Sequence, residues 1–287
     1  MRSRRQRSNV RIAVTGASGV LGSSILEHAP SDGDEVIGIG RGAAVPGHAW
    51  RTADVLRADD LVCAFAGVDA VIHAAAPATL KADDEVLFAR RAIDAAEAAG
   101  VAHFVYVSII NVERNRFFEY YRGKHDAEKL VAESGLGYTI VRSAQFHEFV
   151  AFLVEAFSKQ PVALFPPGAA FQPIDTAAAA ERLAEIARGP AQHRVLDIAG
   201  PQVLAMRDMF DVWKLVYGVR KPSVTLPLPL PLAQVISRNR LIDESAERLG
   251  ITWETWLRAH RDEPNRYAAR LIGRRSSASS RSPRRGR

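Results

Sequence analysis

The chain has 287 residues, enough for one large α/β domain or for a domain that carries a smaller lobe. Apolar residues make up 47% and charged residues 24%, the ordinary mix of a soluble globular protein. The one cysteine, Cys63, excludes a disulfide framework and a cysteine-based metal site. Because Cys63 lies in the apolar stretch 61–65, we expect a buried, inert thiol, no bound metal and a reducing, cytoplasmic location.

The positive charge is confined to the two ends of the chain. The formal net charge is +6, but residues 1–9 hold four arginines and residues 273–287 hold six, with no acid in either stretch. The remaining chain has 28 basic and 32 acidic residues. We therefore expect disordered basic tails at 1–9 and 263–287, and no nucleic-acid binding by the folded body.

No segment predicts export or a membrane span. The residues after the basic start are too few and too polar for a signal peptide. The apolar run Leu226–Leu232 has a proline at every second position and cannot form a membrane helix. We expect it to be an extended connector.

The first half of the chain alternates short β-branched runs with alanine-rich stretches. Strands are predicted at 10–15, 35–39, 69–73, 103–108 and 138–142, and helices at 20–28, 84–99 and 120–134. Strands that are apolar on both faces and separated by helices are typical of a parallel sheet covered on both sides. With right-handed crossovers, this predicts a doubly wound α/β Rossmann fold over residues 10–150.

The second half has a different pattern. Further strands are predicted near 171–175 and 194–199, on either side of a helix at 176–188, and later helices at 206–217 and 253–260. We expect the two strands to extend the sheet and the rest of 151–262 to form a small mixed lobe over its carboxyl edge, where a substrate would bind.

The most informative motif follows the first strand and opens a helix. Gly16 permits a tight turn, Gly19 lets the backbone approach a pyrophosphate, and Gly22 allows close helix–strand packing. The phosphates would lie at the helix N-terminus, on free N–H groups and the positive end of the helix dipole. The predicted dinucleotide-binding residues are Gly16, Ala17, Ser18, Gly19, Val20, Leu21 and Gly22.

Residues that follow the second strand, and a third strand that ends near Thr52, bear on cofactor choice. Arg41 follows the second strand, where an acid would bind a ribose 2′-hydroxyl and an arginine can pair with a 2′-phosphate. A solvated surface arginine is the alternative. Asp54, followed by Val55, is placed to accept a hydrogen bond from the adenine amino group. These residues favour NADP over NAD.

At this point the chain resembles a known group of proteins. Thr15–Gly22, Ala53–Val55 and Val71–Ala76 resemble the extended and atypical short-chain dehydrogenase/reductase superfamily. Within it, the segments Val105–Ile110, Tyr120–Lys124 and Val141–His147 resemble the NmrA-like NAD(P)H-binding group of bacterial proteins. The resemblance covers roughly 10–260. It implies a Rossmann fold, NAD(P)H as cofactor, and cofactor contacts from Ala74 and Ala75.

The resemblance also implies a catalytic set. Tyr120 and Lys124 are four residues apart and share one helix face. The tyrosine would give or take the substrate proton, the lysine would lower the tyrosine pKa and hold the nicotinamide ribose, and Ser108 would polarise the substrate carbonyl. The loop 109–119 departs from the serine-rich loop of well-characterised members. Tyr121 points about 100° away around the helix, and we expect it to pack against the sheet.

Three residues after the strand at 138–142 are candidates for a substrate pocket at the carboxyl edge. Phe146 would form a wall, and Gln145 lies beside it. His147 opens a helix and is either a polar cap or an extra proton donor.

Two classes of function remain open from the sequence. One is an NADPH-dependent oxidoreductase that transfers a hydride to a small carbonyl or quinone-like compound. The other is a protein that holds the dinucleotide without turnover, as a redox sensor or a structural subunit. The presence of Ser108, Tyr120 and Lys124 together favours the first, and the unusual loop between them favours the second. The oligomeric state is not predicted.

Overall fold

The computed structural model describes residues 9–29, 33–227, 241–265 and 267. Nearly all of both predicted basic tails and most of the proline-rich run therefore lie outside the described residues. No helix among the described residues is both long enough and apolar enough to cross a membrane.

The fold is organised by one parallel sheet, whose central strands are buried at nearly every position. Its strand order is β12-β9-β6-β5-β4-β1-β2-β3, and every neighbouring pair is parallel. The order reverses between β1 and β4, which opens a crevice at their carboxyl ends. The strands are β1 (Arg11–Thr15), β2 (Glu35–Gly40), β3 (Ala49–Thr52), β4 (Ala70–His73), β5 (His103–Ile109), β6 (Tyr138–Ser143), β9 (Val195–Ala199) and β12 (Glu247–Arg248).

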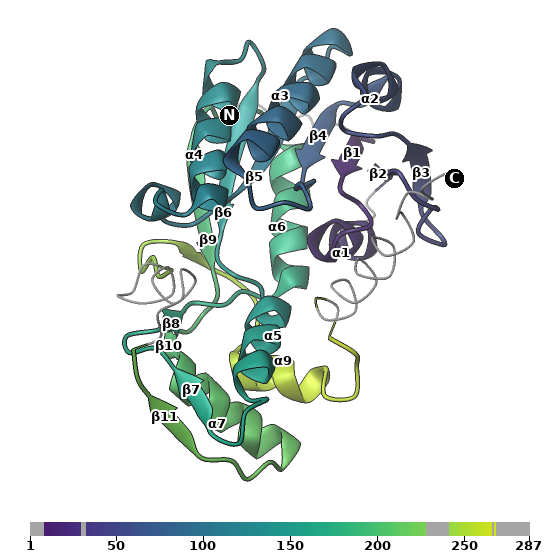
Figure 1. Ribbon diagram of the computed structural model, residues 1–287. Helices are drawn as coiled ribbons and strands as arrows, with labels where there is room; N and C mark the ends of the chain where they lie inside the picture. The colour runs from purple at the N-terminus through teal and green to yellow at the C-terminus, as the bar shows by residue number, and fades with distance from the viewer. Residues whose placement is uncertain (1–8, 30–32, 228–240, 266, 268–287) are drawn as a thin grey trace, which may run out of the picture.

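Helices cover both faces of the sheet (Figure 1). One face packs against α1 (Val20–His28) and α6 (Thr176–Arg188). The other packs against α2 (Ala58–Phe65), α3 (Ala82–Ala98) and α4 (Glu119–Glu133). Successive strand residues alternate between these two cores, which is the pattern that the doubly apolar runs predicted. The Rossmann fold is confirmed.

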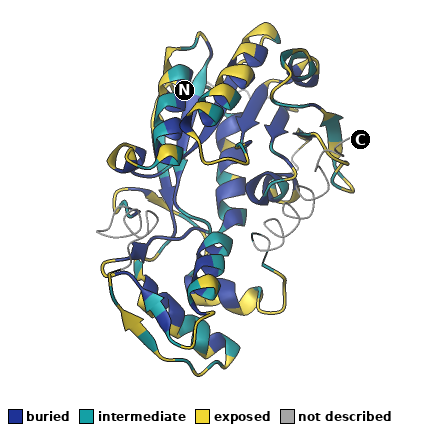
Figure 2. Cartoon of the chain, in the orientation of Figure 1, coloured by how far each residue is buried: buried dark blue, intermediate teal, exposed yellow. Residues whose placement is uncertain are grey.

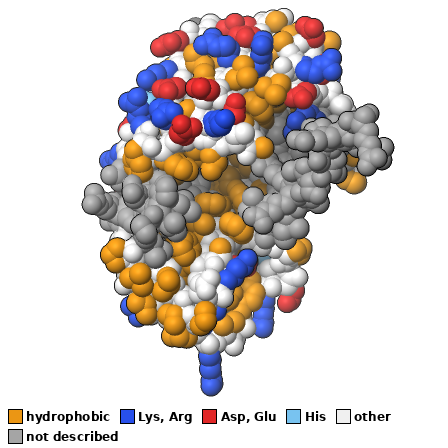
Figure 3. All heavy atoms as spheres, in the orientation of Figure 1, with side chains coloured by type: hydrophobic (Ala, Val, Ile, Leu, Met, Phe, Trp, Pro, Cys, Tyr) orange, Lys and Arg blue, Asp and Glu red, His pale blue; other side chains and the backbone are white. Residues whose placement is uncertain are grey.

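A smaller lobe begins after the carboxyl end of β6. Its core is rich in aromatic residues and includes the fully buried Phe165, Phe171, Phe210 and Trp253. Buried residues, in dark blue, occur in this lobe as well as in the sheet (Figure 2). Hydrophobic side chains gather over this half of the molecule in Figure 3, whereas the sheet half carries charges of both signs. The lobe contains α5 (His147–Phe157), β7 (Ala163–Phe165), β8 (Ala170–Phe171), β10 (Leu204–Ala205), α7 (Met206–Tyr217), β11 (Ser223–Thr225) and α9 (Trp253–Ala259).

Two expectations about this chain are wrong. The predicted strand at 171–175 does not join the main sheet: β8 ends at Phe171 and pairs with β10, and Ile174 makes one isolated bridge to Phe146. Pro173 lacks the N–H that a continuing strand needs. Cys63 is exposed. The buried positions of α2 are Leu61, Ala64 and Phe65, and Cys63 faces solvent. The predicted strand near 194–199 does join the main sheet, as β9.

Candidate functional site

The turn between β1 and α1 has the shape that a dinucleotide phosphate needs. Gly16 has φ +70°, and a Cβ there would lie 2.7 Å from Ala75 Cα and 2.8 Å from Ala74 O. A Cβ at Gly22 would overlap the carbonyl oxygen of Gly16 and lie 2.7 Å from Ala17 Cα. The glycines therefore draw β1, α1 and the end of β4 together, as the sequence predicted.

The first turn of α1 leaves its backbone donors free of side-chain caps. Its N-cap residue is Gly19, which has no side chain to supply, and no acidic residue lies in the first turn. The side chains of Ala17, Val20 and Leu21 are buried, so these residues offer only backbone N–H groups to a ligand, whereas the side chain of Ser18 is exposed. Uncapped N–H groups at a helix N-terminus fit a pyrophosphate.

The end of β4 is tied to this turn by a buried polar contact. His73 Nδ1 lies 2.9 Å from Thr15 Oγ1, and the Ala75 N–H donates to the same hydroxyl oxygen at 3.4 Å. Burial, with a smaller effect of Lys124, lowers the pKa of His73 to about 3. His73 is therefore neutral at physiological pH and holds Ala74 and Ala75 beside Gly16.

Arg41 and Asp54 come together where β2 and β3 end. Arg41 Nη1 lies 3.9 Å from Asp54 Oδ2, and the Arg41 side chain is mostly exposed. Asp54 Oδ1 accepts from the Leu56 N–H at 3.1 Å, which fixes the turn, and the half-buried Val55 packs on the core beside it. We expect the exposed guanidinium to meet a 2′-phosphate at this corner of the sheet.

We expect Arg41→Asp to weaken NADPH binding by about 2 kcal/mol, because a charge-assisted contact becomes a repulsion. NADH binding should be nearly unchanged, and fluorescence titration of both cofactors measures the difference. Arg57→Asp is the matched control, since Arg57 is also exposed and paired with an acid nearby. Equal affinities of the unmutated protein for the two cofactors would contradict the choice of NADP.

Lys124 lies in a buried ion pair that the sequence did not predict. Its Nζ is 2.8 Å from Glu85 Oε1 and donates to the Val107 carbonyl oxygen at 2.9 Å. The Tyr106 hydroxyl donates to the same Glu85 oxygen at 2.9 Å, and Lys124 Nζ lies 4.9 Å from the centroid of the Tyr106 ring. Glu85 is 0% exposed. The Glu85 carboxylate thus balances the Lys124 charge, and the Val107 carbonyl holds the lysine on β5, one residue before Ser108.

Gly123 makes this ion pair possible. A Cβ on Gly123 would lie 2.8 Å from Ala82 Cα and 3.0 Å from Glu85 Cβ. The missing side chain lets the N-terminal turn of α3 approach α4, and Glu85 then reaches the next residue, Lys124. The signal in the sequence was a glycine inside a predicted helix, which commonly marks close backbone approach.

Tyr120 is half-buried at the N-terminus of α4. Burial first, and then the Glu85 carboxylate, raises its pKa well above the ordinary value. The expectation that Lys124 lowers this pKa is wrong, because the lysine charge is offset by Glu85. Tyr120 is therefore a phenol across the physiological range.

Ser108 is buried near the end of β5. Strand alternation places its side chain on the same sheet face as Tyr106, toward α4. Its hydroxyl is one of the buried polar atoms in the described chain that have no hydrogen-bond partner. Gln145 Oε1 is another, and its Nε2 donates to the Tyr121 hydroxyl at 3.5 Å. Buried polar atoms of this kind at the carboxyl edge fit a site that a ligand completes.

Tyr121 and His147 both lie in the lobe. Tyr121 packs into the aromatic core of the lobe and not against the sheet as expected. His147 is 1% exposed, between Trp253 and Trp256, and burial lowers its pKa to about 4. The ring is therefore neutral and enclosed by aromatic groups rather than set in an open pocket. Phe146 is half-buried and joins the lobe to the sheet through its bridge to Ile174.

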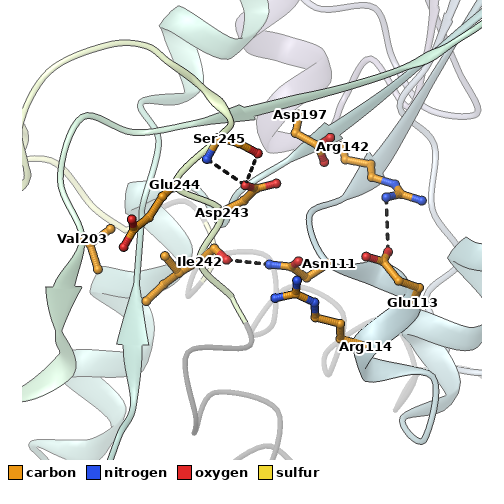
Figure 4. Close-up of a pocket in the computed structure, with 10 residues that line it drawn as sticks. All are labelled: Asn111, Glu113, Arg114, Arg142, Asp197, Val203, Ile242, Asp243, Glu244 and Ser245. Atoms are coloured by element: carbon orange, nitrogen blue, oxygen red, sulfur yellow. Dashed lines mark hydrogen bonds and ion pairs between the residues drawn. The ribbon is translucent and has the colours of Figure 1, made fainter.

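A separate polar cavity of about 560 Å³ lies beside the site (Figure 4). It is bounded by β6, β9, the segment 242–245 and the short helix η1 (Val112–Asn115) with the residue before it. Its walls are held by their own pairings: Asn111 Nδ2 donates to the Ile242 carbonyl at 2.7 Å, and Arg142 Nη1 lies 3.2 Å from Glu113 Oε2. Its lining includes none of the residues predicted for the cofactor or the catalytic set, so we do not place the site there.

Comparison with known proteins assigns the first part of the chain. Residues 16–157 match the NAD(P)H-binding family. This part of the chain is an NAD(P)H-binding domain. The match begins at the first glycine of the dinucleotide turn and covers Lys124 and the segment after β6, and the expectation of a nicotinamide dinucleotide is confirmed.

Individual relatives cover different shares of the chain. The uncharacterized sugar epimerase YhfK of Bacillus subtilis is 33% identical over 94 residues, which are 29% of this chain and 44% of that protein. The photosystem II assembly factor Ycf39 of Cyanophora paradoxa is 25% identical over 232 residues, 76% of this chain and 72% of that protein. The NADPH-dependent quinone oxidoreductase QOR2 of Escherichia coli shares the fold with a TM-score of 0.69 and 21% identity, over 88% of this chain and 100% of that one.

Proposed function

We propose that the protein is an NADPH-dependent oxidoreductase that reduces a small carbonyl or quinone-like compound. The observation that carries this proposal is the arrangement around the end of β5. Lys124 Nζ is held by the Val107 carbonyl next to Ser108, whose buried hydroxyl has no partner among the described residues, and Tyr120 lies one helical turn before Lys124 with its ring against the lobe core.

The residues divide the work between binding and proton transfer. When bound, the cofactor supplies a hydride from its dihydronicotinamide ring. The α1 N-terminus would hold the pyrophosphate, and Arg41 would hold the 2′-phosphate. Ser108 would donate a hydrogen bond to the substrate oxygen, and the Tyr120 phenol would give that oxygen its proton.

Of the two substrate classes, the structural relatives support a quinone-like compound. The Escherichia coli relative is an NADPH-dependent quinone oxidoreductase, and one of its structures contains NADPH. A reduced quinone can take its proton from water, whereas a reduced carbonyl needs an acid in place as the hydride arrives. The raised pKa of Tyr120 is compatible with either acceptor, since the phenol remains protonated.

One observation favours a second candidate function. The Lys124 ammonium is already bound by Glu85 and by the Val107 carbonyl, which leaves it fewer donors for a ribose hydroxyl. A protein that holds the dinucleotide as a redox sensor or structural subunit would tolerate this arrangement.

A panel of electron acceptors separates the two candidates. Purified protein with NADPH and a series of quinones, small aldehydes, ketones and flavins is followed by the loss of absorbance of the reduced nicotinamide. We expect steady NADPH oxidation with at least one quinone or carbonyl, and slower oxidation when NADH replaces NADPH. Tight NADPH binding with no turnover on any acceptor would favour the sensor.

A further inference from the structure

Glu85 is a buried charge that the proposed function does not yet use. It is 0% exposed in the first turn of α3, and one carboxylate oxygen contacts both Lys124 and Tyr106. The other carboxylate oxygen has no partner among the described residues. Burying a carboxylate carries a large desolvation cost, and a pair of hydrophobic residues is commonly as stable as a buried ion pair. The stability of the fold alone is therefore a weak reason for this charge.

The Glu85 carboxylate lies where it balances the positive charge nearest to Tyr120 on α4. Gly123 lets α3 approach α4 so that Glu85 meets Lys124, and Lys124 is one helical turn from Tyr120. A free ammonium at that distance would stabilise a tyrosinate. The Glu85 carboxylate offsets the ammonium and leaves a neutral pair.

We propose that Glu85 is a positioning residue that holds Lys124 on β5 as an ion pair without net charge, so that Tyr120 remains the phenol from which substrate reduction takes its proton. This inference rests on the proposed role of Tyr120 as the proton donor. A bound dihydronicotinamide would supply a hydride to the substrate carbon, the carbonyl electron pair would move to oxygen, and that oxygen would take the Tyr120 proton. The phenolate is then reprotonated by water. Oxidation of an alcohol would need the tyrosinate at the start, which the pair disfavours.

The groups that face Tyr120 come from three elements. They are Glu85 on α3, Tyr106 on β5 and Tyr121 on α4, whereas the Glu128 carboxylate acts on Tyr106. Burial and the Glu85 carboxylate both raise the pKa of Tyr120. Lys124, one helical turn away on α4, is the cation that would lower it once Glu85 no longer balances its charge. Replacing Glu85 by glutamine keeps the shape of the side chain and removes its negative charge. The carboxylate then no longer raises the pKa of Tyr120, and the Lys124 charge is no longer balanced. Both effects lower the pKa of Tyr120.

The test is a spectroscopic titration of tyrosinate absorbance in the full chain, over the pH range in which circular dichroism shows the fold intact. In the unmutated protein, Tyr120 should not ionise before the fold is lost. In Glu85→Gln, the pKa of one tyrosine should be at least about one pH unit lower than in the unmutated protein, so that this tyrosine ionises while the fold is still intact. If this ionisation is absent from the double variant Glu85→Gln/Tyr120→Phe, it belongs to Tyr120. In Lys124→Met the ionisation of Tyr120 should not move down.

Glu128→Gln is the matched control. Glu128 is also buried on α4 and paired, through two hydrogen bonds with Arg142, so its loss removes a similar ion pair on the same helix. A Tyr120 titration in Glu85→Gln identical to that of the unmutated protein would overturn the proposal, as would an equal shift in Glu128→Gln. Should Glu85→Gln fail to fold, Glu85→Asp keeps the charge at a greater distance and should give a smaller shift in the same direction; no shift there would also overturn it. Because the titration needs no turnover, a shift in a protein that reduces nothing would reject the proposed function and leave the charge arrangement standing.

Discussion

Tyr120→Phe is expected to lower turnover on a carbonyl substrate by on the order of 10²–10⁴. The substitution removes one hydroxyl and keeps the ring, which packs against Tyr121 with its centroid 6.0 Å away. The fold and NADPH affinity should both survive, because neither depends on the hydroxyl. Steady-state kinetics with a carbonyl acceptor, together with a NADPH titration, measure both quantities. The loss should fall on kcat, since the proton moves only in the transition state.

Tyr121→Phe is the internal control for this loss. Tyr121 is adjacent, buried, and also has a pKa raised by burial, but it packs into the lobe and hydrogen-bonds to Gln145. Its loss should change turnover little. Lys124→Ala should lower turnover, because it leaves the buried Glu85 carboxylate unpaired beside Tyr106 and Tyr120, and it should lower NADPH affinity if the lysine also holds the nicotinamide ribose, as the resemblance implies. Full carbonyl reduction by Tyr120→Phe would show that another group is the acid. A quinone acceptor is unsuitable here, because water can supply its proton.

Gly22→Val is expected to weaken NADPH binding on the order of 100-fold or more. Even the first added carbon would overlap the carbonyl oxygen of Gly16, and this atom belongs to backbone that cannot rotate away. The helix must move off the turn, which removes its N–H groups from the phosphate position. We also expect a loss of about 1–3 kcal/mol in the free energy of unfolding, the usual cost of overpacking. Fluorescence titration and thermal unfolding measure the two effects.

Gly42→Ala is the control, because a Cβ on Gly42 meets nothing within 4 Å. It should leave both the affinity and the stability nearly unchanged. If Gly22→Val binds NADPH as tightly as the unmutated protein, the dinucleotide lies elsewhere and the site described here is wrong.

The sheet half could be predicted from the sequence because its signals are local. The run before Gly16 and the glycines after it specify a strand, a turn and a helix without reference to distant residues. The helices predicted at 20–28 and 176–188 have those bounds in the structure. The Asp175 side chain accepts a hydrogen bond from the Ala177 N–H and marks the start of the second of them.

The contacts of the site could not be predicted, because they depend on approach between distant segments. Glu85 and Lys124 are far apart in sequence, and only the packing of α3 on α4 at Gly123 brings them together. At His147 the sequence predicted a pocket that the described residues do not form there. The position of this residue after a strand suggested the pocket. Two tryptophans more than 100 residues later enclose the His147 ring. Local pattern does not report which distant side chain will fill a given space.

The most direct test of the central claim is a single-turnover measurement on protein loaded with one equivalent of NADPH. The complex is mixed in a stopped-flow instrument with an acceptor from the panel, using NADPH deuterated at C4 on either face. We predict that the absorbance of the bound reduced nicotinamide decays when the acceptor is added, and that deuterium on one face, but not the other, slows the decay. Bound NADPH that no acceptor oxidises would contradict the account and identify the protein as a holder of the dinucleotide.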